Sequence, residues 1–142
     1  MTAMPTTKQP IPYPTMRYRD AGAMIAWLER AFGFERHVVY DAEDGGIAHA
    51  ELKCGTGLIM MGSARDDFFG KLVKPAADLG GTTQSVYIAV PDADAAFAKA
   101  KAAGAEILMG LTDQPYGSRD FICRDPEGQI WCLGTYAPRP KG

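Results

Sequence analysis

The feature that most constrains the fold is an internal repeat in which residue n corresponds to residue n + 72. Asp20 aligns with Asp92, and each begins an alanine-rich stretch, DAGAMIAWLERAFG and DADAAFAKAKAAG. Further along, GGIAHAELKCGTGLIMMG (45–62) aligns with GSRDFICRDPEGQIWCLG (117–134). Because two such units account for nearly all of the 142 residues, the repeat predicts two copies of one supersecondary unit.

Each unit has the pattern β-α-β-β-β. A strand (12–19, then 84–90) precedes a helix that begins with an aspartate as N-cap and ends at a glycine, Gly33 or Gly104. A short strand and a hairpin follow, with turn-forming residues in KCGT and DPEG. We therefore expect an α+β fold in which two curved sheets form a cleft with the helices outside. The expected organisation is a single domain, 1–142, made of a first module at 11–62, a linker at 63–83 and a second module at 84–136.

Strand periodicity assigns the two faces of each sheet, because successive side chains point to opposite sides. The face under the helix should hold Ala50, Leu52, Ile59 and Met61. We expect His49 to stand opposite Met60 in the first hairpin. The other, concave face should then carry Ile47, His49, Glu51, Leu58 and Met60 in the first unit, and by the 72-residue offset Arg119, Phe121, Cys123, Ile130 and Cys132 in the second.

Composition excludes several classes of protein. A net charge of −2 and a pI near 5.6, with no cluster of Lys or Arg, argue against nucleic acid as a partner. The longest apolar stretches are too short to cross a bilayer. The N-terminal sequence MTAMPTTKQPIPYP reads as a stiff, proline-spaced arm, not a secretion signal. Three widely spaced cysteines do not make a disulfide framework, so we expect a cytoplasmic location.

The paired units, together with the closing stretch YGSRDFICRDPEGQIWCLGTY (116–136), resemble the vicinal oxygen chelate superfamily. This superfamily includes glyoxalase I, extradiol dioxygenases and bleomycin resistance proteins. The Gly-Ser-Arg, Asp-Pro-Glu-Gly and Ile-Trp-x-Leu segments are similar to the glyoxalase-like subgroup. Since the fold hosts several reactions and some pure binders, the resemblance implies the architecture more strongly than the activity.

The resemblance also implies where a metal would be held. Metal-dependent members take up to four ligands, usually His and Glu, from the first and last strands of each unit. Carried onto this chain, those positions are Tyr13, Met60, Ser85 and Cys132. A phenol, a thioether, a hydroxyl and a single thiol do not make a site for a hard or borderline divalent cation. We therefore expect no metal centre and no cofactor.

Other residues on the concave face are candidates for ligand binding or chemistry. His49 and Glu51 stand on one strand face and suit either ligand contact, acid/base catalysis or a mutual hydrogen bond. A residual metal held by these two with Cys123 is a further alternative. Arg17 and Arg119 could each hold an anionic group, or instead pair with a carboxylate near the rim. Together the expected ligand-binding residues are Tyr13, Arg17, His49, Glu51, Met60, Ser85, Tyr87, Arg119, Phe121 and Cys132.

Two functions remain open at this point. The first is a metal-free protein that binds a small molecule, similar to bleomycin resistance proteins that sequester a drug without changing it. The second is a glyoxalase-like lyase or isomerase that uses His49 and Glu51 as acid and base, with or without a divalent metal. Many relatives are homodimers, so the resemblance also implies a homodimer. Cys123 and Cys132 lack a neighbouring base, and we expect small buried side chains there, not nucleophiles.

Overall fold

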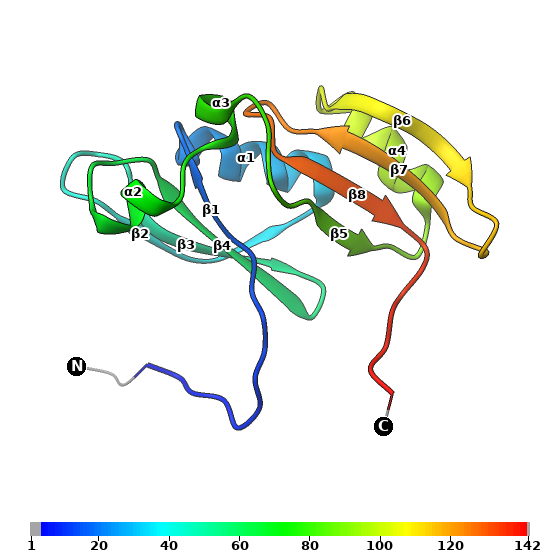
Figure 1. Ribbon diagram of the computed structural model, residues 1–142, viewed down its shortest axis with the longest axis horizontal. Helices are drawn as coiled ribbons and strands as arrows, with labels where there is room; N and C mark the ends of the chain where they lie inside the picture. The colour runs from blue at the N-terminus through cyan, green and yellow to red at the C-terminus, as the bar shows by residue number, and fades with distance from the viewer. Residues whose placement is uncertain (1–3, 142) are drawn as a thin grey trace.

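The computed structural model describes residues 4–141 and contains two four-stranded sheets and four helices in that range (Figure 1). In chain order the elements of the first unit are β1 (Thr15–Tyr18), α1 (Ala21–Phe32), β2 (Glu35–Asp41), β3 (Ile47–Cys54) and β4 (Gly57–Ser63). The linker carries α2 (Phe68–Leu72) and α3 (Ala76–Leu79). The second unit comprises β5 (Val86–Ala89), α4 (Ala93–Ala102), β6 (Glu106–Asp113), β7 (Arg119–Arg124) and β8 (Ile130–Gly134).

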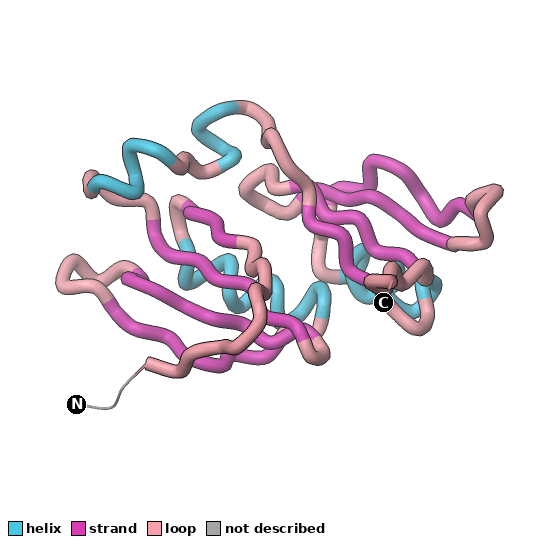
Figure 2. The backbone as a smooth tube through the Cα atoms, turned by 60° about the horizontal axis from the view of Figure 1, so that its bottom comes forward, coloured by secondary structure: helices cyan, strands magenta, loops and turns pink. Residues whose placement is uncertain are grey.

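The two sheets have the same topology. Their strand orders are β1-β4-β3-β2 and β5-β8-β7-β6, with the first strand of each unit pairing in parallel with the last. Helix α1 contacts all four strands of the first sheet, and α4 contacts three strands of the second. Figures 1 and 2 show α2 and α3 apart from these helices, along the linker. The expected α+β fold of repeated βαβββ units is confirmed.

The helix boundaries follow from their capping residues. The side chain of Asp20 accepts a hydrogen bond from the backbone N–H of Ala23, and Asp92 accepts one from Ala95. Helix α1 ends at Gly33, whose φ of 74° is the left-handed conformation that favours glycine. Helix α4 ends one residue earlier than expected, with Ala103 as its C-cap.

The core joins the two units. Trp27 and Leu28 of α1 are buried, and the Trp27 indole donates a 2.7 Å hydrogen bond to the carbonyl of Ala103, beyond the end of α4. Trp131 of β8 is fully buried and packs against Phe32 and Phe34 of the first unit at ring-centroid distances of 5.1 and 5.8 Å. The apolar surface of α1 therefore covers part of the second sheet as well as the first.

We call the side of each sheet turned away from α1 and α4 its open face. In the first sheet, Ala50, Leu52, Ile59 and Met61 are buried on the helix face, as periodicity predicts. The expected register is wrong by two residues, because Glu51 and not His49 pairs with Met60. A shift of two leaves every side chain on its predicted face.

The predicted faces of β7 are wrong. Phe121 pairs with Leu133 and Cys123 with Trp131, and all four side chains are buried on the helix face. Cys132 pairs with Ile122 on the open face instead. The cause is the turn: residues 125–129 separate β7 from β8, whereas only residues 55 and 56 separate β3 from β4. The repeat offset is therefore 72 in β8 but 71 in β7, and one residue of slip exchanges the two faces of a strand.

Candidate functional site

A hollow of about 220 Å³ lies on the open face of the first sheet. Its lining includes Thr15 and Arg17 from β1, His49 from β3 and Met60 from β4, with Phe69 of α2 at its border. Nε2 of His49 lies 2.9 Å from Oε2 of Glu51, two residues along the same strand. The hollow thus combines an apolar and sulfur-containing wall with the His49 imidazole, which Glu51 contacts from the neighbouring position on its strand face.

Arg17 does not point freely into this hollow. Its guanidinium, 8% exposed, donates to both carboxylate oxygens of Asp67 at 3.2 and 3.0 Å, and to the carbonyl of Ser63 at 3.4 Å. Of the alternatives for Arg17, the pair with an aspartate is the one present. A two-pronged contact of this kind fixes both partners, because the planar guanidinium matches the geometry of the carboxylate.

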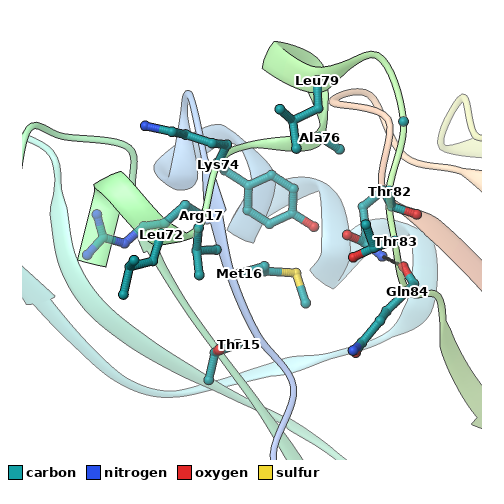
Figure 3. A pocket seen from close by; sticks show the side chains of 14 residues that line it. Thr15, Met16, Arg17, Leu72, Lys74, Ala76, Leu79, Thr82, Thr83 and Gln84 are labelled. Atoms are coloured by element: carbon teal, nitrogen blue, oxygen red, sulfur yellow. Dashed lines mark hydrogen bonds between the residues drawn. The ribbon is translucent and has the colours of Figure 1, made fainter. Parts of the chain in front are cut away.

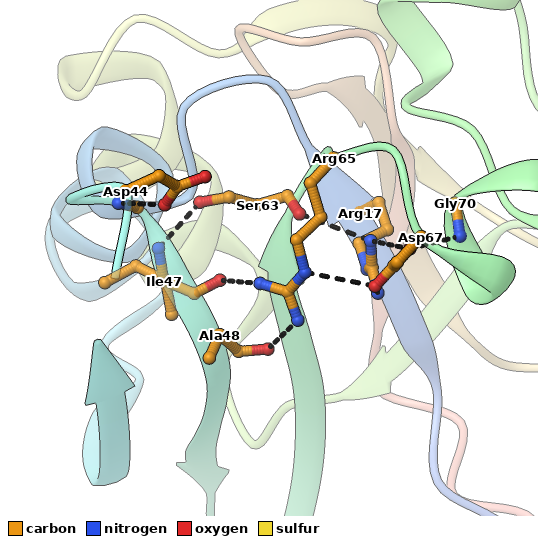
Figure 4. A network of polar contacts seen from close by, with 9 residues as sticks. Arg17, Asp44, Ile47, Ala48, Ser63, Arg65, Asp67 and Gly70 are labelled. Atoms are coloured by element: carbon orange, nitrogen blue, oxygen red, sulfur yellow. Dashed lines mark hydrogen bonds and ion pairs between the residues drawn. The ribbon is translucent and has the colours of Figure 1, made fainter. Parts of the chain in front are cut away.

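Arg65 binds the same aspartate from the other side (Figure 4). Its Nε donates to Oδ2 of Asp67 at 3.0 Å, while its terminal nitrogens donate to the carbonyls of Ile47 at 3.5 Å and Ala48 at 3.3 Å. The β3–β4 ladder ends at the Ala50–Met61 pair, so Arg65 provides donors to carbonyls just beyond it. The linker is thereby tied to the sheet immediately after β4.

The Asp67 carboxylate also caps the short helix α2. Oδ1 accepts a 2.7 Å hydrogen bond from the backbone N–H of Gly70. The hydrogen bonds from Arg17, then that from Gly70, and then that from Arg65 hold the pKa of the Asp67 carboxyl well below its usual range. The guanidinium carbon of Arg17 also lies 4.9 Å from the centre of the Phe69 ring.

The open face of the second sheet carries a different group of side chains. Cys132 lies beside Tyr87, its partner in the β5–β8 ladder. Burial, and then the nearby carboxylate of Asp120, raise the pKa of the Cys132 thiol. Asp120 is 4% exposed and accepts hydrogen bonds from the Gln114 amide at 2.9 Å and the Tyr116 hydroxyl at 3.4 Å. These bonds brace the β6–β7 hairpin.

The remaining predicted residues lie in several places. Tyr13 and Ser85 border a groove of about 410 Å³ between the N-terminal arm and β5, which Tyr87 also lines. Phe121 is buried against Phe97 of α4, with ring centroids 5.2 Å apart, so it does not reach the open face. The Arg119 guanidinium pairs with Asp94 of α4 and with Asp113, on the helix side. The expected orientation of Phe121 and Arg119 toward the cleft is wrong, for the register reason given above.

The four positions aligned with metal ligands do not provide a fitting donor set. Met60 lines the hollow of the first sheet, whereas Tyr13 and Ser85 border the groove beside β5. Cys132 lies in the other sheet, on β8, beside Tyr87. Across residues 4–141, no three side chains of His, Cys, Asp or Glu gather closely enough to hold an ion. The residues present therefore do not fit the metal that the resemblance implies.

A further cavity, of about 360 Å³, lies between β1 and the segment that precedes β5 (Figure 3). Met16 and the buried ring of Tyr18 border it on one side, and Thr82, Thr83 and Gln84 on the other. Leu72 and Leu79, from the two linker helices, complete its rim. The linker thus contributes to this cavity as well as to the hollow of the first sheet.

Sequence reasoning missed Asp67, Phe69 and Asp120. Asp67 carries a recognisable signal, because an aspartate directly before apolar residues, as in DFF, is typical of an N-cap. No local pattern shows that this aspartate meets Arg17, 50 residues away in the sequence.

None of the helices within residues 4–141 has the length and the apolar character that a membrane-spanning helix needs.

Residues 11–133 match the family model of the Glyoxalase/Bleomycin resistance protein/Dioxygenase superfamily. Protein Mb0911c of Mycobacterium bovis is 30% identical over 126 residues, which are 89% of this chain and 83% of that protein. The crystal structure of TioX from Micromonospora sp. ML1 is similar with a TM-score of 0.71 and 30% identity, covering 93% of this chain and 100% of that one. A superfamily enzyme from Burkholderia phytofirmans shares the fold at 21% identity and a TM-score of 0.63, covering 86% and 94%.

Proposed function

Since the chain belongs to the Glyoxalase/Bleomycin resistance protein/Dioxygenase superfamily, we propose that it binds a small molecule and holds it unchanged, as the superfamily's bleomycin resistance proteins do. The proposed site is the hollow on the open face of the first sheet. Its ligand-contacting residues would be His49, Glu51 and Met60, with Phe69 above them.

The observation that carries this proposal is the chemistry of the open faces. At the positions where metal-dependent relatives place His and Glu, this chain has Tyr13, Met60, Ser85 and Cys132, while a hollow remains whose lining is mostly apolar and includes His49. Apolar walls with a few placed polar groups are typical of small-molecule sites. We include Tyr13, Ser85, Tyr87 and Cys132 as ligand contacts in the adjoining groove.

Mass spectrometry of the natively purified protein would identify a ligand that co-purifies. Isothermal titration would then measure the affinity of the protein for that ligand. Planar, cationic, anionic and peptide-like antibiotics would be titrated in the same way as further probes. We expect His49→Ala to weaken binding by about tenfold, equivalent to about 1.4 kcal/mol. The chain has one other histidine, so His37→Ala on β2 is the matched control and should bind normally. A protein that binds none of these molecules would contradict the proposal.

The 2.9 Å contact between His49 and Glu51 favours a second candidate, a lyase or isomerase in which this pair moves a proton. A carboxylate that orients an imidazole is a common arrangement for general acid/base catalysis. On a candidate substrate, this function predicts a bell-shaped pH–rate profile that His49→Ala abolishes. Turnover that is unaltered in His49→Ala excludes the pair as the acid and base.

We also propose a homodimer in the cytoplasm, whose clefts are completed by modules of both chains. The N-terminal arm supports this, because residues 4–14 are all exposed and the start of this segment extends away from the sheets (Figure 1). Exposed apolar side chains such as Ile11 and Tyr13, at 51% and 40%, suit an interface. Light scattering coupled to gel filtration tests the oligomer, and a monomer at micromolar concentration contradicts it.

A further inference from the structure

Helix α2 is attached to the rest of the molecule mainly by polar contacts. Of its five residues only Gly70 is buried, while Phe68 and Leu72 are 76% and 65% exposed. The attachment comes instead from Asp67, which accepts hydrogen bonds from Arg17, Arg65 and the Gly70 N–H. A segment with so little buried apolar surface opens at a lower free energy than the sheet beneath it.

We propose that residues 65–72 form a lid over the hollow of the first sheet, and that its latch consists of the contacts of Asp67 with Arg17 and of Arg65 with the carbonyls of Ile47 and Ala48. The lid borders the hollow through Phe69, which faces the same space as His49 and Met60. This inference rests on the proposed function, because it assigns access to that same site. Opening the lid withdraws Phe69 and exposes the wall formed by Met60.

The closed position of the lid has a steric requirement at Gly70. A Cβ atom at this residue would lie 2.1 Å from the carbonyl oxygen of Arg65 and 2.9 Å from Oδ1 of Asp67. The first contact is with backbone, which cannot rotate away. Because both contacts lie within residues 65–72, a larger side chain at residue 70 distorts the turn of the lid itself and displaces Asp67 from its position beside Arg17.

The latch and the tight turn at Gly70 offer two ways to open the lid, one through charge and one through space. Asp67→Asn removes the charge that pairs with the two arginines, and Gly70→Ala removes the space. Asp66→Asn, one residue earlier, is the matched charge control. Gly81→Ala is the matched glycine control, because a Cβ at Gly81 meets nothing within 4 Å.

Hydrogen exchange followed by mass spectrometry reports the opening without any ligand. In the closed lid, the N–H of Gly70 is bonded to Asp67 Oδ1 and that of Val73 to the Phe69 carbonyl. Neither substitution alters the donor or the acceptor of the Val73 bond, so we expect exchange of the Val73 amide to be at least tenfold faster in Asp67→Asn and in Gly70→Ala than in either control. Protection of β3 and β4 should stay unchanged, which shows that the variants fold.

Oxidation of methionine by hydrogen peroxide reports access to the hollow. Met60 lines it, and Met4, 80% exposed on the N-terminal arm, is an internal reference. We expect Met60 to oxidise several-fold faster relative to Met4 in both lid variants than in the controls. Equal exchange and equal oxidation in all four variants would overturn the lid. Failure to find a ligand would leave both readouts unaffected, so it would contradict the proposed function and not the lid.

Discussion

The hydroxyl of Tyr18, in the first unit, donates a 2.7 Å hydrogen bond to Oδ2 of Asp125, 107 residues later in the second unit. The same oxygen accepts a 3.0 Å bond from the Trp131 indole, and Oδ1 accepts from the backbone N–H groups of Glu127 and Gln129. These four donors satisfy the hydrogen-bonding capacity of the Asp125 carboxylate, which is only 3% exposed. The first residue of the DPEG turn therefore joins the two units.

The Glu127 side chain extends this joint. Its carboxylate accepts hydrogen bonds from the backbone N–H groups of Arg19 at 2.6 Å and Asp20 at 2.9 Å, just before α1 begins. A negative charge at a helix N-terminus is stabilised by the helix dipole. One hairpin turn of the second unit thus supports both the buried Tyr18 and the start of α1.

We predict that Asp125→Ala strongly destabilises the protein. The substitution leaves the buried Tyr18 hydroxyl and Trp131 indole without an acceptor, and each such donor costs about 1–3 kcal/mol. We expect the free energy of unfolding to fall by about 3 kcal/mol or more in urea titrations. Tyr18→Phe removes a donor and leaves Asp125 three partners, so it should cost about 1 kcal/mol. Similar small losses in both variants would contradict the role assigned to Asp125.

Stability should fall in alkaline solution because of Tyr18. Burial, and then the carboxylate of Asp125, raise the pKa of Tyr18 well above 10.0. Above that pH the unfolded chain loses the phenol proton while the folded protein keeps it, so the folded state loses stability as the pH rises. The contribution is about 1.4 kcal/mol for each pH unit until the folded pKa is reached.

Urea unfolding of wild type and Tyr18→Phe between about pH 8 and pH 11 would measure this effect. Other groups also titrate there, so the test is the difference between the two proteins. The wild type should lose its advantage over Tyr18→Phe as the pH rises. A constant difference across the range would mean that Tyr18 does not keep its proton in the folded state.

Sequence alone predicted the elements well, because they depend on local signals. Asp20, Gly33 and Asp92 mark the helix ends, and the strand period placed Leu52 and Met61 in the core. The prediction of which β7 side chains face the helix was wrong, for a reason that periodicity cannot detect. The turn at residues 125–129 is longer, and the Asp125 side chain stabilises it through hydrogen bonds to backbone N–H groups within it. The 72-residue alignment treated the two hairpin turns as equal in length, so it shifted β7 by one residue.

Sequence alone predicted only those contacts of the candidate site that form between residues of the same strand. His49 and Glu51 meet because residues two apart share a face. The Arg17–Asp67 contact depends on how the linker returns over the sheet, and no pattern in the linker specifies that path. Arg17 and Arg119 were therefore indistinguishable in the sequence, although one is buried beneath α2 and the other lies beside α4.

That difference predicts unequal effects of replacing the two arginines by methionine. Arg17→Met removes a guanidinium that is 8% exposed and leaves Asp67 with Arg65 alone, so we expect the melting temperature to fall by roughly 5 °C. Arg119→Met breaks pairs with Asp94 and Asp113, which are mostly exposed, and should change it by less than about 2 °C. Calorimetry measures both, and equal shifts would contradict the burial of the Arg17 pair.

The three cysteines should differ in their reactivity toward thiol reagents. Burial, followed by the charge of Asp125, raises the pKa of Cys123 to about 12, and its side chain is fully buried opposite Trp131. Burial also raises the thiol pKa of Cys54 and Cys132, which are only partly buried. Because the thiolate is the reactive form, all three should react more slowly at neutral pH than a free thiol in solution. We expect Cys54 and Cys132 to be modified in the native protein and Cys123 only after unfolding in urea, as mass mapping of the labelled peptides would show. Rapid native labelling of Cys132 would instead identify it as an activated nucleophile on the open face of the second sheet.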